Sequence, residues 1–294
     1  MVCERSAILF RAVAPSSGLG GLAARHYQII VISDRKYEPG TAMAGIAKGQ
    51  AHTPFGRPLD LPPPFRAVAL REVGDAFAHA TMLAPDSGAG TLVHVGRYDL
   101  AEFAVVLEPE EPLRTARRAL YAGLTALAEA LAVHAPPEKP INFAWPDAIL
   151  IDGGLVGGAR LAWPASSDED APPAWLVFGA MIRTAAIDEQ EPGLHPLAAA
   201  LDAEGFDLGS HRLLESFARH LMVAIDAWQQ IGFGEVARSY LSRLAPKKGV
   251  RPDIGDNGDL LMCDTDGTAI ERRPLLTVLA MPSWLDLSTG GPRL

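Results

Sequence analysis

Apolar residues recur every three to four positions in several stretches of this chain, and this spacing places them on one face of a helix. We end each stretch at the next proline, glycine or polar cluster, because such residues stop helices. On this basis we expect helices over residues 73–84, 113–133, 197–204 and 211–231. The last is long and amphipathic, so one of its faces should pack on a core.

Runs of β-branched and aromatic residues between turn residues predict strands among these helices. The clearest turn is Asp152-Gly153-Gly154, a type that lets two twisted strands pair, and it joins residues 148–151 to residues 156–162. A short polar segment joins residues 91–95 and 103–107 into a second hairpin. The other expected strands are residues 27–32 and 175–184, with several short ones after Lys247.

Changes in this pattern divide the chain. Residues 1–60 show one strand-like run amid Gly, Ser and Ala, and we interpret them as an extension of uncertain order. Residues 58–64 form a stiff proline-rich linker, because residues before proline avoid helix. Helices and strands mix over residues 61–245, whereas residues 246–294 hold short strands and turns. We predict an α+β domain with a mixed or antiparallel sheet packed by helices, followed by a small all-β domain.

Composition limits the partners expected for these 294 residues. The net charge of -9 argues against nucleic acid, because phosphate binding depends on clustered cations. Two cysteines, Cys3 and Cys263, are too few for a disulfide framework, which favours a reducing, cytoplasmic setting. No apolar run approaches the roughly 20 residues of a membrane-spanning helix. We therefore expect a cytoplasmic protein that binds neither nucleic acid nor membrane.

The most informative stretch is residues 145–158, Trp-Pro-Asp-Ala-Ile-Leu-Ile-Asp-Gly-Gly-Leu-Val-Gly-Gly. It resembles the central motif of the biotin/lipoate A/B protein ligase family: Trp-Pro-Asn-Asp, a strand, a turn, then Lys-x-x-Gly. Without a gap, Trp145, Pro146 and Gly158 fall on the family's Trp, Pro and Gly. Two later segments are also similar to the family and follow in its order. They are Val177-Phe-Gly179-Ala-Met-Ile182-Arg183 and Ile254-Gly-Asp-Asn-Gly258-Asp-Leu260-Leu261 with Asp266-Gly267.

The resemblance covers about residues 60–294 and implies the ligase fold with a small SH3-like C-terminal domain. Ligases of this type join the carboxylate of biotin or lipoate to AMP and then pass the acyl group to a lysine of a carrier protein. The resemblance therefore implies ATP and Mg²⁺ as cofactors. It also implies a small carboxylic acid (biotin, lipoate or octanoate) as substrate and a biotinyl or lipoyl carrier domain as partner.

The chain departs from the family where the chemistry is expected. The family's lysine, a cation that stabilises charge developing at phosphorus, falls on Leu155. The Asn-Asp pair after Trp-Pro is Asp147-Ala148. Of the Gly-Arg-Gly-Arg-x-Gly-Arg loop that closes over the acyl-adenylate, only Gly96-Arg97 remains. We expect a divergent member that lacks the catalytic lysine.

Strand alternation offers replacement cations. Gly158 and Arg160 share a face of one strand, and Gly179 and Arg183 share a face of the next. Because both glycines border the ligand in the family, the two arginines should point toward one pocket. Guanidinium groups can grip carboxylate and phosphate with paired hydrogen bonds. We predict that Arg160 and Arg183 form an anion site; the alternative is that both reach solvent at strand ends.

The other candidates each have a structural alternative. Asp147 is a candidate Mg²⁺ ligand or acceptor-lysine contact, and otherwise caps the turn after Pro146. Trp145 is a candidate for stacking on a ligand ring, and otherwise a core residue. Lys139, the only lysine between residues 60 and 245, is read as a surface residue. The remaining candidates for ligand binding are Gly157, Gly158, Gly179, His94 and Arg97.

Two functions stay open at this point. In the first, the protein is a ligase or acyltransferase with a rebuilt anion site. In the second, it is a catalytically degenerate relative that binds the acid or an acyl carrier without activating it. The retained glycines and the C-terminal motif favour the first, whereas Leu155 and the reduced Arg-rich loop favour the second. The sequence thus predicts family membership and leaves catalysis open.

Overall fold

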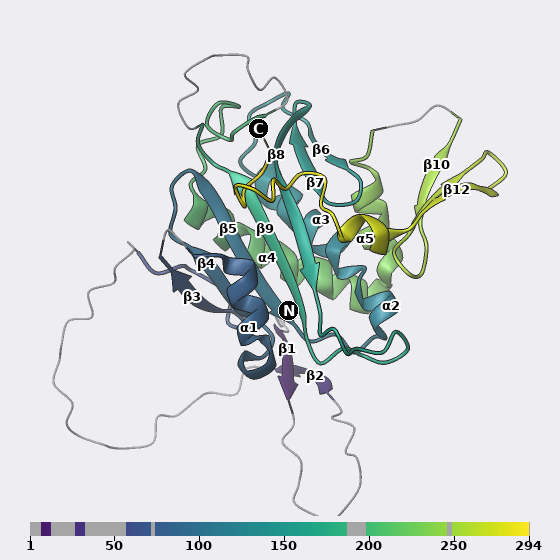
Figure 1. The fold of residues 1–294 in the computed structure, drawn as a ribbon, viewed down its shortest axis with the longest axis horizontal. Coiled ribbons are helices and arrows are strands. Elements are labelled where there is room, and N and C mark those ends of the chain that lie inside the picture. The colour runs from purple at the N-terminus through teal and green to yellow at the C-terminus, as the bar shows by residue number, and fades with distance from the viewer. Residues whose placement is uncertain are drawn as a thin grey trace, which may run out of the picture.

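The computed structural model describes residues 7–12, 27–32, 57–71, 74–186, 198–245 and 249–293. Its main sheet has seven strands, and neighbouring strands are antiparallel except for the parallel pair β3 and β4 (Figure 1). Across the sheet the order is β3 (Arg66–Leu70), β4 (Thr91–Val95), β5 (Leu100–Leu107), β9 (Leu176–Arg183), β8 (Gly154–Ala162), β7 (Ala148–Ile151) and β6 (Ile141–Ala144). The predicted mixed sheet is confirmed.

Helices α3 (Ala119–Ala132) and α4 (Ser210–Ile231) cover one face of this sheet (Figure 1). Apart from Thr125 and Glu129, α3 is apolar, which suits its position between the sheet, α4 and α5 (Phe233–Leu241). Gly123 permits the close approach, because a β-carbon there would lie 2.2 Å from the Phe178 ring. The main core therefore lies between the sheet and α3 and α4.

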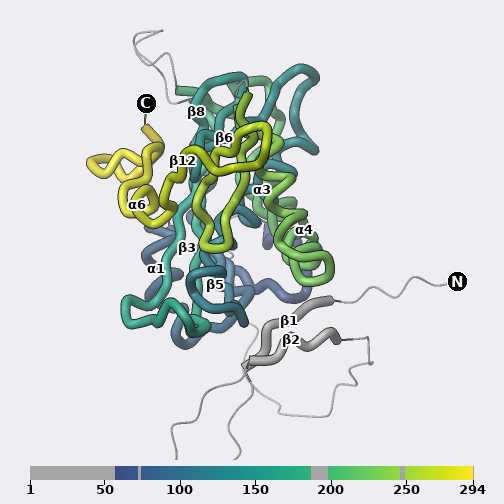
Figure 2. Tube along the Cα trace, turned by 90° about the vertical axis from the view of Figure 1, so that its right-hand side faces the viewer, coloured from purple at the N-terminus to yellow at the C-terminus, as the bar shows by residue number. Residues whose placement is uncertain are grey.

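The opposite face is covered by two elements that are far apart in sequence. Helix α1 (Ala76–Ser87) packs on β4, β5 and β9. Residues 282–293, which we name the C-terminal segment, lie on the same side of the sheet as α1, away from α4 (Figure 2). Trp284 and Leu285 of this segment pack on Met181 of β9. This second face is therefore divided between α1 and the C-terminal segment.

A separate three-stranded antiparallel sheet follows α5. It consists of β10 (Arg251–Ile254), β11 (Leu260–Cys263) and β12 (Ala269–Arg273), and α6 (Leu275–Leu279) comes next. Leu260 and Leu275 are buried in the same core as α3. The predicted small C-terminal β-sheet is thus present. Its SH3-like character and the boundaries at residues 60 and 245 stay predictions.

Near the N-terminus, β1 (Ala7–Ala12) pairs antiparallel with β2 (Tyr27–Ile32), so the strand expected at residues 27–32 is confirmed. The rest of the expected extension, as far as residue 56, lies outside the described residues. None of the helices described combines the length and apolar character needed to cross a membrane.

The helix expected over residues 113–133 is interrupted. It forms α2 (Leu113–Ala116) and α3, with a break at Arg117 and Arg118. At the break, Leu120 N donates to Arg117 O and Tyr121 N to Arg118 O, a tighter three-residue spacing. Arg118 pairs with Glu111 of the loop before α2, and Arg117 pairs with Glu169 of the distant loop between β8 and β9. These side-chain contacts override the helical pattern of the sequence.

The helix expected over residues 197–204 is wrong for the residues that the structure describes. Ala198 forms a parallel bridge with Leu155, and Ala199 N donates to Leu155 O at 3.0 Å. Leu201 N donates to Arg183 O at 3.0 Å. The backbone therefore bonds to the main sheet and then turns, although its composition favours helix; tertiary pairing outweighs propensity here. Helix α1 also continues past Pro85 to Ser87, beyond the predicted stop.

Candidate functional site

The glycines of β8 and β9 lie on the sheet face that α1 and the C-terminal segment cover. Gly158 pairs with Met181, and Arg160, two residues further along β8, pairs with Gly179. Because side chains alternate along strands, Gly158, Arg160, Gly179 and Arg183 share this face, as alternation predicts. We name it the glycine face. From Gly179 to Arg183 the strand advances roughly 13 Å at about 3.3 Å per residue, so the two arginines lie at different ends of the face.

A β-bulge brings Leu155 to the same face. Leu150 pairs with Leu155 and Ile149 with Gly157, so Val156 is the extra residue of β8. The three-residue spacing from Leu155 to Gly158 would otherwise put the two on opposite faces. Leu155 is half-buried and packs beside Trp284. The position of the expected lysine therefore points to the glycine face and carries an apolar group.

Gly157 is required by the backbone of the bulge. Its φ is 156°, and a β-carbon there would lie 1.9 Å from Met181 O. No side chain fits at that distance. The structure therefore explains Gly157 by the close approach of two strands, and its proposed contact with a ligand stays a prediction.

Aromatic side chains from distant parts of the chain fill the space above the two glycines. A β-carbon on Gly158 would lie 2.5 Å from the Trp284 ring, and one on Gly179 would lie 2.4 Å from the Phe77 ring of α1. Trp284 is 1% exposed, and its Nε1–H donates to Ala159 O at 3.1 Å. The glycines thus leave room for flat rings, and in this structure the protein itself supplies them.

The space above Gly158 is tightly bounded, so Gly158→Ala should lower the free energy of unfolding by about 1–3 kcal/mol. The new methyl group would meet both Asp147 O and the Trp284 ring at 2.5 Å. Chemical denaturation measures the loss. Gly234→Ala is the control, because a β-carbon there meets nothing within 4 Å and alanine favours helix. Equal stability of both variants would contradict this packing.

Arg160 lies at the α1 end of the glycine face. Its guanidinium stacks on Phe77, 4.4 Å from the ring centroid, and lies 3.7 Å from the Asp75 carboxylate. Burial lowers the pKa of Arg160, and the charges of Asp75 and Glu102 oppose that change. The side chain is largely buried rather than directed into solvent. Arg160 is therefore a cation held beside Gly179.

Glu102 is a buried carboxylate on this face that sequence reasoning did not identify. It lies opposite Met181 on β5 and accepts a hydrogen bond from Ala76 N, at the start of α1, at 2.8 Å. Burial raises its pKa, and the Ala76 hydrogen bond opposes the rise. Asp75 caps the same helix end by accepting from Ala78 N at 2.9 Å. Together they fix the end of α1 that carries Phe77.

Arg183 lies at the other end of the glycine face. It donates to Pro292 O at 3.0 Å and lies 3.5 Å from Ala199 O. Arg97 is near the Arg183 end, because its partner Asp99 accepts a backbone hydrogen bond from Thr184 N, next to Arg183, at 2.9 Å. The Arg97 hydrogen bond, with a smaller effect of the Arg183 charge, lowers the pKa of Asp99. The guanidinium of Arg97 contacts both carboxylate oxygens of Asp99, at 2.5 and 3.1 Å. The structure thus groups Arg97 with Arg183, and separates both from Arg160.

Asp147 is fully buried next to Trp284. Neither of its carboxylate oxygens has a hydrogen-bond partner among the described residues. Burial raises the pKa of Asp147 to about 7, and the nearby backbone N–H of Asp147 and indole N–H of Trp284 only partly offset the rise. An unpaired buried carboxyl is costly, so it is neutral below this pKa.

Asp147 does not fit the role of a metal ligand in this arrangement. Mg²⁺ takes about six oxygen ligands, and this carboxyl is isolated. In the part of the chain that the structure describes, no three His, Cys, Asp or Glu side chains are grouped to hold a metal ion. We therefore derive no step through Mg²⁺.

Two other candidates lie away from the glycine face. His94 shares the opposite face of the sheet with Leu92, where its ring meets His211 of α4 at 5.8 Å. Burial, followed by the His211 charge, lowers its pKa to about 4. Trp145 packs against the main core and donates from Nε1 to Tyr121 OH at 3.1 Å. Both residues therefore stabilise the fold rather than line the glycine face.

Two features near the face complete its description. Lys139 is a partly exposed residue that pairs with Asp152 at 2.9 Å and Glu204 at 2.8 Å.

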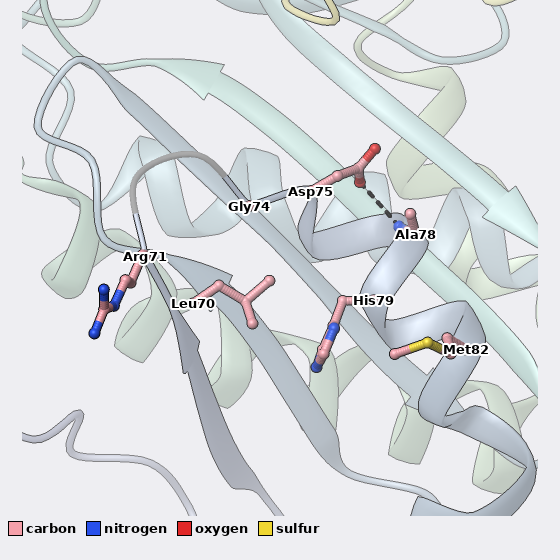
Figure 3. A pocket seen from close by; sticks show the side chains of 7 residues that line it. All are labelled: Leu70, Arg71, Gly74, Asp75, Ala78, His79 and Met82. Carbon is pink, nitrogen blue, oxygen red and sulfur yellow. Dashed lines mark hydrogen bonds between the residues drawn. The ribbon is translucent and has the colours of Figure 1, made fainter.

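A hollow of about 420 Å³ opens between β3 and the outer side of α1, and His79 and Met82 point into it (Figure 3). None of its lining residues comes from β8 or β9. The hollow is thus separate from the glycine face.

Comparisons with known proteins agree with this geometry. The sequence profile described as "Biotin/lipoate A/B protein ligase family" matches residues 61–242. A biotin protein ligase-like protein of unknown function from Silicibacter sp. TM1040 aligns with a TM-score of 0.64 and 29% identity, over 75% of this chain and 99% of that one. Biotin protein ligase from Aquifex aeolicus aligns with a TM-score of 0.55 and 17% identity, over 71% and 95%. Among curated proteins there is no significant match.

Proposed function

Because this chain belongs to the biotin/lipoate A/B protein ligase family, we propose that it binds a small carboxylic acid of the biotin, lipoate or octanoate type on the glycine face. One observation carries the proposal: Gly158 and Gly179 leave ring-sized spaces, occupied in this structure by Trp284 and Phe77, on a face of β8 and β9 that has Arg160 at one end and Arg183 at the other. Apolar walls with a few placed cations suit a small acid that has a hydrocarbon body. An Aquifex aeolicus biotin protein ligase of similar fold has been solved with biotin and ATP (TM-score 0.50, 17% identity, over 69% of this chain and 94% of that one), which supports this class of ligand.

We further propose that the bound acid reacts with ATP. A carboxylate oxygen attacks the α-phosphorus, the bond to the β-phosphate oxygen breaks, and pyrophosphate leaves with that electron pair. The amine of a carrier lysine then attacks the acyl carbon, AMP leaves, and the lysine loses a proton as the amide forms. Arg183 is the cation that stabilises charge at phosphorus, because it is buried on the glycine face and already donates to an oxygen acceptor there, the Pro292 carbonyl.

Leu155 favours a second candidate function. At the position of the family's lysine, this chain presents an apolar side chain to the glycine face. A site without a preorganised cation at that point loses about 10²–10³ in rate for each missing donor. In this second candidate the protein binds the acid, or an acylated carrier, and does not activate it.

Pyrophosphate release separates these two candidates. The protein is incubated with ATP and biotin, lipoate or octanoate in turn, and binding of each acid is measured in parallel by thermal shift. Release with any acid supports activation by this chain. Binding without release supports the second candidate, and the absence of both binding and release with all three acids contradicts the proposed function.

The anion site predicts that Arg160→Ala and Arg183→Ala each weaken acid binding by about 10- to 100-fold, because each removes a charged hydrogen-bond donor. Arg183→Ala should also slow pyrophosphate release by about 10²–10³-fold. Isothermal titration and a coupled pyrophosphate assay measure these effects. Arg238→Ala is the matched control, since Arg238 is an exposed arginine of α5 paired with Glu235. Unchanged affinity in both site variants would rule out the anion site.

A further inference from the structure

The C-terminal segment closes the glycine face with the groups that a bound acid would need. Trp284 fills the space above Gly158, and Leu285, which is 4% exposed, packs beside it on Leu100 and Met181. At the far end, Arg183 donates to the carbonyl oxygen of Pro292. The segment therefore supplies a flat ring and an oxygen acceptor, which are also the features of a ring-bearing carboxylic acid.

The segment is a self-contained unit. Its two ends pair with each other: Arg293 N donates to Trp284 O at 2.8 Å, Asp286 N donates to Gly291 O at 2.9 Å, and Leu285 bridges Pro292. Among the described residues, this unit is hydrogen-bonded to the main sheet through side-chain donors, Trp284 and Arg183. The segment can therefore leave the face without breaking the strand ladder.

With the C-terminal segment covering the glycine face, one buried polar group beside Trp284 has no hydrogen-bond partner among the described residues. The Asp147 carboxyl is fully buried close to the Trp284 indole N–H, which donates to Ala159 O, and neither carboxyl oxygen has a hydrogen-bond partner in the described part of the chain. An unpaired buried carboxyl opposes the closed arrangement, whereas water or a polar ligand group could pair with it after Trp284 moves. This favours a segment that opens and closes over the glycine face, and argues against one that is a fixed wall of the site.

We propose that residues 282–293 are an internal occupant of the ligand site. A small carboxylic acid enters by displacing Trp284 from above Gly158 and by replacing the Pro292 carbonyl at the Arg183 guanidinium. The inference rests on the proposed function, since it concerns access to that same site. Wild type binds acid weakly, because only molecules whose glycine face is open can bind it. The apparent affinity is the intrinsic affinity multiplied by the fraction of open molecules.

The test compares acid binding by the full-length protein and two variants. Isothermal titration with biotin, lipoate and octanoate is done on wild type, Trp284→Ala and Leu287→Ala. Leu287 belongs to the same segment but is 79% exposed, so it is a matched control. We expect at least one acid to bind Trp284→Ala at least about tenfold more tightly than wild type, because opening the face removes the competition. Leu287→Ala should behave as wild type.

A second measurement needs no variant. Hydrogen–deuterium exchange is followed in wild type over residues 282–293, with and without a saturating concentration of the acid that binds. Faster exchange in this segment with acid present supports displacement. Equal affinities of wild type and Trp284→Ala, together with unchanged exchange, would overturn the internal occupant while leaving acid binding intact. If all three proteins are folded and bind none of the acids, the proposed function fails and this inference fails with it.

Discussion

Replacing Phe217 with alanine should lower the free energy of unfolding by about 3–5 kcal/mol. Phe217 of α4 is 0% exposed, and its ring lies 4.6 Å from that of Phe103 and 5.7 Å from that of Phe178. These two rings belong to β5 and β9, so Phe217 joins α4 to the centre of the sheet. Removing the ring loses burial and two aromatic contacts, and a closely packed core collapses only partly around the cavity.

Guanidinium denaturation measures this loss, with the slope of the transition checked for two-state behaviour. Val223→Ala is the control on the same helix, because Val223 is 66% exposed. Its change should stay within about 0.5 kcal/mol. A loss of less than 1 kcal/mol for Phe217→Ala would mean that α4 is not anchored to the sheet in this way.

Asp147→Asn should remove a dependence of stability on pH that amounts to at most about 4 kcal/mol. The carboxyl has an ordinary pKa of 3.8, and burial raises it to about 7 in the folded chain. Between these values the unfolded chain has lost the proton and the folded chain still holds it. The contribution is therefore fully present below pH 3.8 and is lost as pH rises to about 7. Asparagine cannot ionise, so the variant lacks this loss.

Urea denaturation of wild type and Asp147→Asn from pH 4 to pH 8 tests the sign. The free energy of unfolding of the variant, relative to wild type, should rise with pH and level off above pH 7. Asp226→Asn is the control, since Asp226 is an exposed carboxyl on α4. A constant difference between Asp147→Asn and wild type over the whole range would show that Asp147 ionises alike in both states.

The sequence predicts the sheet and its helices better than it predicts their ends. The turn at Asp152 and Gly153 is predictable because a two-residue hairpin needs positive φ at both residues, and Asp-Gly is a pair that accepts it. The structure has φ values of 50° and 85° there. The break at Arg117 was not, because it depends on an ion pair with Glu169, 52 residues away. The helix predicted over residues 197–204 is wrong for a similar reason, since residues 198–204 bond to Leu155 and Arg183, which are far away along the chain.

The sequence predicts the strand residues of the candidate site but not the aromatic residues that cover them. Alternation and the family motif identify Gly158, Gly179, Arg160 and Arg183, because each depends on a local strand pattern. They do not identify Trp284, which is 126 residues after Gly158 in the sequence, or Phe77, whose place depends on how α1 crosses the sheet. One signal was available: Trp284-Leu285 is a bulky apolar pair amid Pro, Ser, Asp and Gly, with no periodic element to bury it. Such a pair must dock elsewhere on the molecule.

The late position of Trp284 in the chain has a consequence during synthesis. The strands and helices that build the glycine face are complete once α5 ends at Leu241, and Trp284 follows about 40 residues later. At about 5–20 residues per second the ribosome needs roughly 2–8 seconds to make this stretch. During that interval the nascent chain has the face but not its cover. If residues 282–293 occupy the ligand site as proposed, an acid meets no competitor in that interval, and the order of translation gives the first chance of loading.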